Sequence, residues 1–485
     1  MGRTLMTSLG YVALLCAQCL ILMGCSGKSL ILSISDNRKD SVDHYSVCAQ
    51  VNNLKADSFR VSPSISKIRM FNQLEIPDFA EARLSVRAID VNGLVIGSGY
   101  SSTHWTANAL VEQIDVTIDY FQEPYRCSSQ TGFCADPQYE QRDIAWRGVW
   151  LSESGDEGWA VGADVVYAPE RPLRPRLSHY THGRWELVPD EMLPSGLAAQ
   201  NIFINAVWGS DQTHVWAVGD RGTILYWDGV RWNDISRKNT CTYSNDLYGV
   251  WGTKQTIGVR GTADVCKPWV VGNNGTVSCL DGSLWDCSRK VELTSNRIAV
   301  LRKLGGSSPS DVWLVGGYVY CLEKNCPAYQ LLMKYEGGKF VEVNRDGIEH
   351  PGYLTNISGV GAEHVWSVTD TAEILEWNGK EWTARQPKTR DNSIDFGALD
   401  KDMNYVNGFN AVWMGAQNDV WIAMYSGKVL NWHMNSAGIE SWNVSATPSP
   451  LALLALSGSD SCNMLLAGHA DYRAVYLPDE LPDDP

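Results

Sequence analysis

A short pattern recurs along most of this 485-residue chain. Its clearest copy runs from Val215 to Trp232 and reads V-W-A-V-G-D-R-G-T-I-L-Y-W-D-G-V-R-W. Seven copies of the central segment, some of them degenerate, follow at intervals of 44 to 57 residues. They begin at Trp159, Trp216, Trp269, Trp313, Trp366, Trp421 and Leu465. Such a repeat constrains the architecture first, because each copy must bury the same face against its neighbour.

Each copy contains four short β-prone runs, and none has a long helical pattern. Apolar residues alternate with a period near two, as in residues 204–209. Asp228-Gly229 and Asn378-Gly379 separate the third run from the fourth and supply the positive φ angles of tight hairpins. Four-stranded units at this period are typical of propeller blades. The sequence therefore predicts an all-β chain with a seven-bladed β-propeller over residues 145–478.

Nineteen of the twenty Trp residues lie at or after Trp146. Such rings could stack on sugars, but Trp at fixed repeat positions is more typical of packing between blades.

The seventh copy ends near Leu477 without a fourth run. Because a bare sheet edge would pair with other chains, a segment within residues 137–145 is predicted to complete the last blade.

The N-terminus resembles the signal of a bacterial lipoprotein. An apolar stretch over residues 9–23 follows Arg3 and leads into Gly24-Cys25. Its length and the small residues at its end are typical of an export signal. The resemblance implies removal of residues 1–24, acylation of Cys25 and attachment to a membrane without a spanning segment. The expected location is the bacterial envelope, at the outer membrane on its periplasmic side or at the cell surface. An ordinary secretory signal is the alternative.

Ten cysteines remain once the signal and Cys25 are set aside, and an even number in an exported chain indicates disulfides. Three candidate pairs follow from short spacing or from position beside a hairpin turn: Cys127–Cys134, Cys321–Cys326 and Cys279–Cys287. Cys241 and Cys266 leave other pairings open around Cys279. Cys48 and Cys462 either stay free or join the N-terminal module to the last blade.

The segment before the repeats divides into three predicted parts. Residues 25–40 are polar and read as a tether. Residues 41–122 contain short alternating runs separated by Pro, Asn or Gly, which indicates a small Ig-like β-sandwich. Residues 123–144 read as a linker with a small Cys loop, and residues 479–485 form an acidic tail after the propeller.

The net charge of −15 argues against a nucleic-acid partner, which would require a basic face.

Most long loops join the second run to the third or the fourth run to the next copy, and both kinds leave the same face of a blade. Because function concentrates in elaborated loops, binding is expected on that face, at the channel mouth. The clearest basic cluster, Arg171, Arg174 and Arg176, would contact an anion there or remain a solvated loop.

Evidence for a cofactor or for catalysis is weak. Asp391, Asp395 and Asp400 could hold calcium but lack EF-hand spacing, and a solvated loop is the alternative. His179 and His182 have a spacing seen in metal sites, without a third ligand nearby. The chain has no G-x-S-x-G, no H-E-x-x-H and no phosphate-binding glycine motif.

The pattern from Val215 to Trp232 resembles the Trp-rich repeats of secreted, often lipid-anchored propellers of myxobacteria. It is similar to photosystem II assembly-factor-like propellers and, more loosely, to sialidase propellers with Asp-box turns. The resemblance covers about residues 145–477 and implies the fold, but the sialidase Arg triad and Tyr nucleophile match no position here. We therefore expect a non-catalytic binding module for a protein or glycan. The alternatives are a glycan-acting hydrolase with channel-mouth carboxylates and a purely structural envelope protein.

Overall fold

The computed structural model describes residues 29–51, 57–65, 67–71, 81–106, 111–126, 132–136, 143–165, 173–181, 183–236, 244–253, 268–281, 284–286, 291, 293, 297–321, 326–343, 350–387, 408–435, 438–448, 451–460, 462–469 and 472–476. In this part of the chain, regular structure is β-strand apart from four short 3-10 helices. No helix within these ranges is long and apolar enough to cross a membrane.

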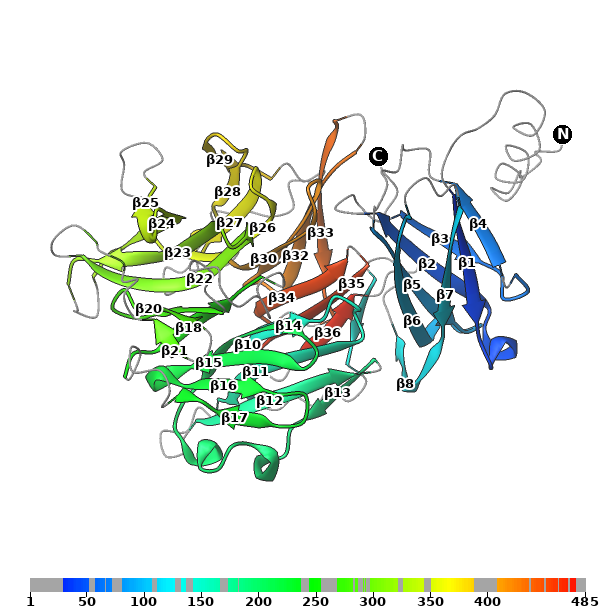
Figure 1. Ribbon diagram of the computed structural model, residues 1–485, viewed down its shortest axis with the longest axis horizontal. Coiled ribbons are helices and arrows are strands. Elements are labelled where there is room, and N and C mark those ends of the chain that lie inside the picture. The colour runs from blue at the N-terminus through cyan, green and yellow to red at the C-terminus, as the bar shows by residue number, and fades with distance from the viewer. Residues whose placement is uncertain are drawn as a thin grey trace.

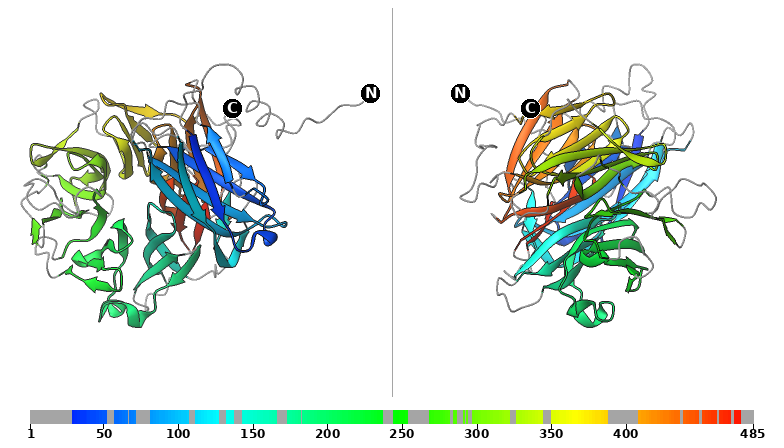
Figure 2. Two further views of the ribbon diagram at one scale, coloured as in Figure 1. Left: turned by 45° about the vertical axis from the view of Figure 1, so that its right-hand side comes forward. Right: turned by 90° about the vertical axis from the view of Figure 1, so that its left-hand side faces the viewer.

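Seven four-stranded antiparallel sheets make up the C-terminal part of the described chain, and each is called a blade here. The first strands of neighbouring blades contact one another, and the first strand of the last blade contacts that of the first, so the blades form a closed ring (Figures 1 and 2). The repeat therefore folds as a β-propeller, which confirms the all-β prediction.

The strands follow the order of the repeats. Blades 1 to 4 consist of β10 (Ile144–Leu151), β11 (Glu157–Asp164), β12 (Arg174–Thr181), β13 (Arg184–Leu187); β14 (Ile204–Asp211), β15 (His214–Gly219), β16 (Ile224–Trp227), β17 (Trp232–Asp234); β18 (Leu247–Trp251), β19 (Trp269–Gly272), β20 (Val277–Asp281), β21 (Leu284–Asp286); and β22 (Ile298–Ser308), β23 (Asp311–Val319), β24 (Ala328–Glu336), β25 (Lys339–Glu342). Blades 5 to 7 consist of β26 (Leu354–Gly361), β27 (His364–Thr369), β28 (Ile374–Trp377), β29 (Trp382–Arg385); β30 (Phe409–Ala416), β31 (Asp419–Met424), β32 (Lys428–Met434), β33 (Glu440–Ala446); and β34 (Leu453–Asp460), β35 (Asn463–Gly468), β36 (Arg473–Tyr476), β9 (Phe133–Ala135).

The second-strand tryptophans hold adjacent blades together. The ring of Trp159 in blade 1 packs against Trp227 and Trp232 of blade 2, each at a centroid distance of 4.9 Å. The same three-ring contact joins four further pairs of blades: Trp269 with Tyr335 and Phe340, Trp313 with Trp377 and Trp382, Trp366 with Trp432 and Trp442, and Trp421 with Tyr476 and Phe133. The periodic aromatic residues are therefore packing residues, because each fills the wedge between two blades.

The fourth strand of the last blade comes from upstream of the propeller. β9 pairs with β36, so that Phe133 lies opposite Tyr476. The prediction that residues 137–145 would supply this strand is wrong in position. Phe133 supplies the aromatic ring that every fourth strand needs and is fully buried, whereas the predicted segment leads into β10. The predicted linker over residues 123–144 thus contains the strand that closes the ring.

The N-terminal module is a sandwich of two sheets. One has the strand order β4-β1-β7, and the other has β3-β2-β5-β6-β8. Its strands are β1 (Ser29–Ser35), β2 (His44–Val51), β3 (Asp57–Val61), β4 (Lys67–Phe71), β5 (Glu81–Ile89), β6 (Leu94–His104), β7 (Val111–Thr117) and β8 (Asp119–Arg126). The tether predicted for residues 25–40 does not extend that far, because Leu30, Leu32 and Ile34 of β1 are buried in the core of the sandwich.

The sandwich is fixed to the ring beside the last blade (Figure 1). A disulfide joins Cys48 of β2 to Cys462, in the turn between β34 and β35. The buried Arg87 of β5 donates hydrogen bonds to the carbonyl of Cys462 and, at 3.1 Å, to Oδ1 of Asn463. Side chains of both parts also share one apolar cluster, which includes Ile89 and Val95 of the sandwich. The two parts therefore pack as one body.

We predict that Phe133→Ala destabilises the protein by about 3–5 kcal/mol, because it leaves a cavity where the ring closes. Urea denaturation of the variant measures this loss. Val230→Ala is the control, since Val230 is 78% exposed in a hairpin turn and its truncation should cost less than about 0.5 kcal/mol. Equal stability of the Phe133 variant and the wild type would show that β9 does not close the ring.

Candidate functional site

The first strand of every blade carries a β-bulge at the same point, near the end from which the loops between second and third strands emerge. The register shift leaves one extra residue in each strand: Arg147, Asn205, Tyr248, Arg302, Thr355, Asn410 and Leu454. These seven residues are called the bulge ring below. A bulge re-aims its side chain, so the ring surrounds the mouth of the channel on the face that the loop lengths indicate.

Three members of the bulge ring connect neighbouring blades. The side-chain amides of Asn205 and Asn410 donate hydrogen bonds to the carbonyls of Leu247 and Leu453, at 2.9 and 2.7 Å. The hydroxyl of Thr355 donates in the same way to the carbonyl of Phe409, at 2.7 Å. In each case the acceptor directly precedes the bulge of the next blade. These short polar side chains therefore have a structural role.

The two arginines of the bulge ring differ from these members. Arg147 donates one hydrogen bond to Oδ1 of Asn205, at 2.8 Å, and its guanidinium lies 3.5 Å from the ring centre of Phe203. Arg302 lies between Tyr248 and Tyr353, at 5.1 and 4.9 Å from their ring centres, and its Nε is buried without a hydrogen-bond partner. Among the described residues, neither guanidinium has a carboxylate within ion-pair distance.

The charged groups at the mouth lie close enough to shift one another's pKa. Burial lowers the pKa of Arg147, the nearby Asp220 partly offsets this, and repulsion from Arg302 lowers it further. His469 also has a lowered pKa, through burial and then the charge of Arg147, so its imidazole is neutral at neutral pH. Two arginines close enough to repel each other, with donors to spare, form an arrangement that an anion stabilises.

Three carboxylates also surround the mouth, but each accepts a backbone hydrogen bond. Asp220 accepts from the amide of Phe203 and Asp370 from the amide of Tyr353, both at 2.8 Å. Asp246 accepts from the amide of Arg221 at 2.9 Å. Burial raises the pKa of Asp370, although hydrogen bonds and Arg302 oppose that effect. These aspartates hold loops in place, and nothing in their contacts assigns them a reaction.

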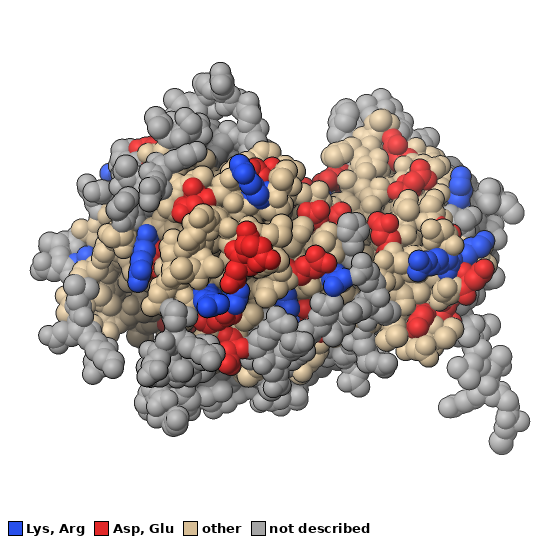
Figure 3. Space-filling model, turned by 90° about the horizontal axis from the view of Figure 1, so that it is seen from below, with Lys and Arg blue, Asp and Glu red and all other residues tan. Residues whose placement is uncertain are grey.

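The basic cluster predicted from the sequence is largely neutralised. Nε and Nη2 of Arg176 bind both oxygens of Asp164 at 2.8 and 2.7 Å, and its Nη1 binds Asp190 at 2.6 Å. Arg174 lies 3.8 Å from Asp190, and Arg171 lies outside the described residues. Acidic and basic side chains are interspersed on the face that Figure 3 presents.

Arg147 and Arg302 were not predicted from the sequence. A β-bulge adds one residue to a strand without a recognisable sequence pattern, so the sequence of one repeat does not reveal it.

The other predicted residues divide into two groups. Cys321 and Cys326 form a disulfide, and Cys134 and Cys279 are disulfide-bonded as well. His179 stacks on Trp159 at 4.3 Å, as a packing residue does. The rest lie outside the described residues: Cys25, Cys127, His182, Cys287, Asp391, Asp395 and Asp400. Within the described part of the chain, no group of three His, Cys, Asp or Glu could hold a metal ion.

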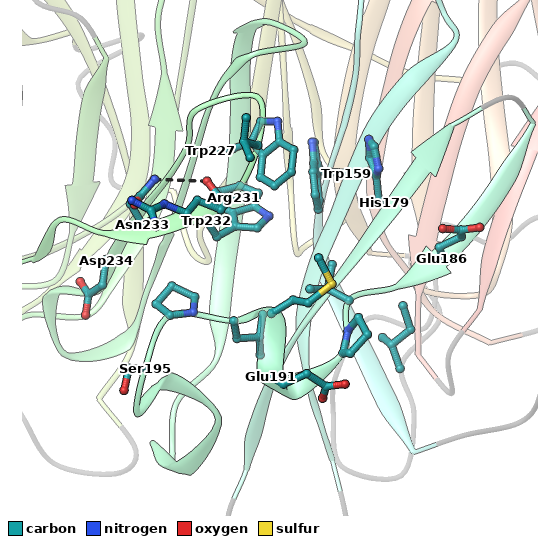
Figure 4. Close-up of a pocket in the computed structure, with 17 residues that line it drawn as sticks. Trp159, His179, Glu186, Glu191, Ser195, Trp227, Arg231, Trp232, Asn233 and Asp234 are labelled. Carbon is teal, nitrogen blue, oxygen red and sulfur yellow. Dashed lines mark hydrogen bonds between the residues drawn. The ribbon is translucent and has the colours of Figure 1, made fainter.

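A cavity of about 770 Å³ lies away from the channel mouth, between the outer strands of blades 1 and 2 (Figure 4). Trp159, His179 and Trp232 line it, but Trp159 and Trp232 are almost fully buried by the contact between the blades. At its rim, Met192 and Val230 are 61% and 78% exposed. Trp159 and Trp232 are therefore engaged in blade packing and do not offer open faces for stacking on a sugar.

No protein-family model and no curated protein matches this chain. Solved structures to which it is similar include "YCF48 bound to D1 peptide", with 16% identity, coverage of 74% of this chain and 98% of that chain, and a TM-score of 0.48. "YCF48 from Cyanidioschyzon merolae" has 11% identity, coverage of 72% and 99%, and a TM-score of 0.46. The RRP9 WD40 repeats have 12% identity, coverage of 73% and 99%, and a TM-score of 0.48.

We predict that truncation destabilises the protein much less at Arg302 than at the buried Arg473. Arg302→Met should change the free energy of unfolding by less than about 1 kcal/mol, since only contacts with two rings are lost. Arg473→Met should cost about 3–5 kcal/mol, because it removes the buried cation that pairs with the buried Asp136. Nη2 of Arg473 lies 3.0 Å from Asp136, and both side chains are at most 6% exposed. Urea denaturation measures the free energy of unfolding of both variants. Equal losses of stability would contradict the inference that Arg302 has no charge partner.

Proposed function

We propose that this protein is an exported, lipid-anchored, seven-bladed propeller with an Ig-like module, and that it binds a protein partner without catalysis. The observation that carries the proposal is the pair of arginines in the bulge ring. They lie at the mouth of the ring, on the face with the longest loops, and among the described residues no carboxylate lies within ion-pair distance of either guanidinium.

The chemistry of the mouth favours an acidic segment of a protein as the ligand. A guanidinium fork binds carboxylates through two parallel hydrogen bonds, and arginine is enriched among the residues that dominate binding energy at interfaces. Phe203, Tyr248 and Tyr353 hold the two forks in place, so little side-chain entropy is lost on binding. The chain carries a net charge of −15, so local attraction at the mouth would act against overall repulsion and confer specificity.

The glycan alternative, including hydrolysis, receives less support. A glycosidase needs two carboxyl groups that are available to the substrate. Asp220, Asp246 and Asp370 each accept a backbone hydrogen bond that fixes a loop. In the aromatic cavity between blades 1 and 2, the packing of the blades already buries Trp159 and Trp232.

Binding at the mouth is tested with residues 29–485 produced as a soluble protein. The double variant Arg147→Gln/Arg302→Gln should bind Glu-rich peptides at least about tenfold more weakly than the wild type, as measured by fluorescence anisotropy at fixed salt. Arg385→Gln is the matched control, because Arg385 lies on the outer strand β29 and pairs with Glu376 and Glu440. Equal affinity of the double variant and the wild type, or turnover of a glycan panel, would contradict the proposal.

Lipid attachment is tested separately with the full chain in a Gram-negative host. We expect incorporation of labelled palmitate into the wild type and its loss in Cys25→Ser. Cys48→Ser serves as a control for the loss of a thiol elsewhere, since Cys48 lies in the disulfide with Cys462. Labelling that persists in Cys25→Ser would refute the anchor and leave the proposed binding site unaffected.

A further inference from the structure

One repeat position stands out when the seven first strands are compared. The residue that follows the bulge is Gly or Ala in five blades: Gly148, Ala206, Gly249, Ala411 and Ala455. The packing of the blades explains this preference. A Cβ on Gly148 would lie 2.9 Å from Cα of Ala206, and one on Gly249 would lie 3.2 Å from Cα of Lys303. Blade 5 has Asn356 at this position, and blade 4 has Lys303.

Lys303 lines a cavity of about 370 Å³ inside the central channel. First-strand residues of all seven blades surround this cavity, and the sandwich contributes Arg83. Its other charged lining residue is Glu153, which pairs with Arg83 at 2.5 Å. The space would hold roughly a dozen waters at about 30 Å³ each, which is enough for a small molecule.

The ammonium of Lys303 has no hydrogen-bond or ion-pair partner among the described residues, and surrounding protein lowers its pKa to about 8. Two neighbouring side chains in the cavity use their oxygens to accept backbone hydrogen bonds. Oδ1 of Asn356 accepts from Ile357 at 2.8 Å, and Oγ of Ser358 accepts from Met414 at 3.1 Å. Their amide and hydroxyl hydrogens remain available as donors.

We propose that the channel cavity is a binding site for a small carboxylate anion, held by the ammonium of Lys303 with Asn356 and Ser358 as further donors. One unpaired cation balances the single charge of a carboxylate, whereas a doubly charged phosphate would leave a buried charge uncompensated. This site lies within the channel, separate from the arginines at its mouth, and does not depend on the protein-binding function proposed above.

The test uses residues 29–485 with lysines reductively methylated with ¹³C-formaldehyde. The NMR signal that Lys303→Met removes belongs to Lys303. We expect it to titrate near pH 8 and acetate to raise this pKa toward its ordinary value, because a bound carboxylate stabilises the ammonium. At matched ionic strength, chloride and phosphate should have much smaller effects. Acetate binding should weaken by about tenfold or more in Lys303→Met.

Lys339→Met is the matched control, because Lys339 is exposed on the outer strand of the same blade, and it should leave acetate binding unchanged. A Lys303 signal that ignores acetate would overturn the proposal. An equal response to chloride, acetate and phosphate would overturn it as well, by showing non-specific attraction of anions. If Lys303→Met fails to fold, Lys303→Arg removes the same signal while keeping the charge and provides the assignment, so the titration of the wild type still decides the question.

Discussion

The ring depends on one contact, in which an indole from the second strand of one blade lies between two aromatic side chains of the next. Trp159, Trp313 and Trp421 show it in different parts of the ring. A large flat side chain fills a wedge that widens outward, and edge-to-face packing adds about 0.5–1.5 kcal/mol per pair beyond burial. Because this contact joins two blades, an isolated blade would leave its tryptophan unpacked. The stability of each blade therefore depends on its neighbours.

The ring therefore closes only if the last of these contacts between blades forms. Trp421 can complete it only with Phe133, which lies far away in sequence. Asp136, directly after this strand, pairs with the buried Arg473 of β36, and Arg473 also donates to Ser178 of blade 1 at 2.6 Å. The closing strand therefore links the last blade to the first. Because β8 of the sandwich leads into it, and Cys48 joins the sandwich to Cys462, closure also fixes the N-terminal module.

The sequence predicted what repeats and missed what depends on register or on distant parts of the chain. The Trp anchors and the Asp228-Gly229 turn, with φ of 88° at Gly229, are encoded locally. Phe133 directly follows Gly132, and Phe340 lies two residues after Gly338, but this weak similarity can be recognised only once a fourth strand is known to need an aromatic residue. The bulges were hidden because each inserts one residue without changing composition. For that reason Arg147 and Arg302 were not candidates, while Arg176, conspicuous in sequence, is paired with two aspartates.

A repeat protein also offers an internal comparison that single domains lack, because equivalent positions face equivalent packing demands. The position after the bulge tolerates almost no side chain in five blades, so a lysine there opposes the local packing rule and has to be desolvated as well. Asn205, Thr355 and Asn410 show what a purely structural residue does in the neighbouring bulge position, since each donates to the next blade. Arg302 and Lys303 are consecutive, donate to no protein acceptor among the described residues, and both belong to blade 4. Arg302 and Lys303 are thus two departures from the repeat that the contacts between neighbouring blades do not require, and both proposed binding sites include one of them.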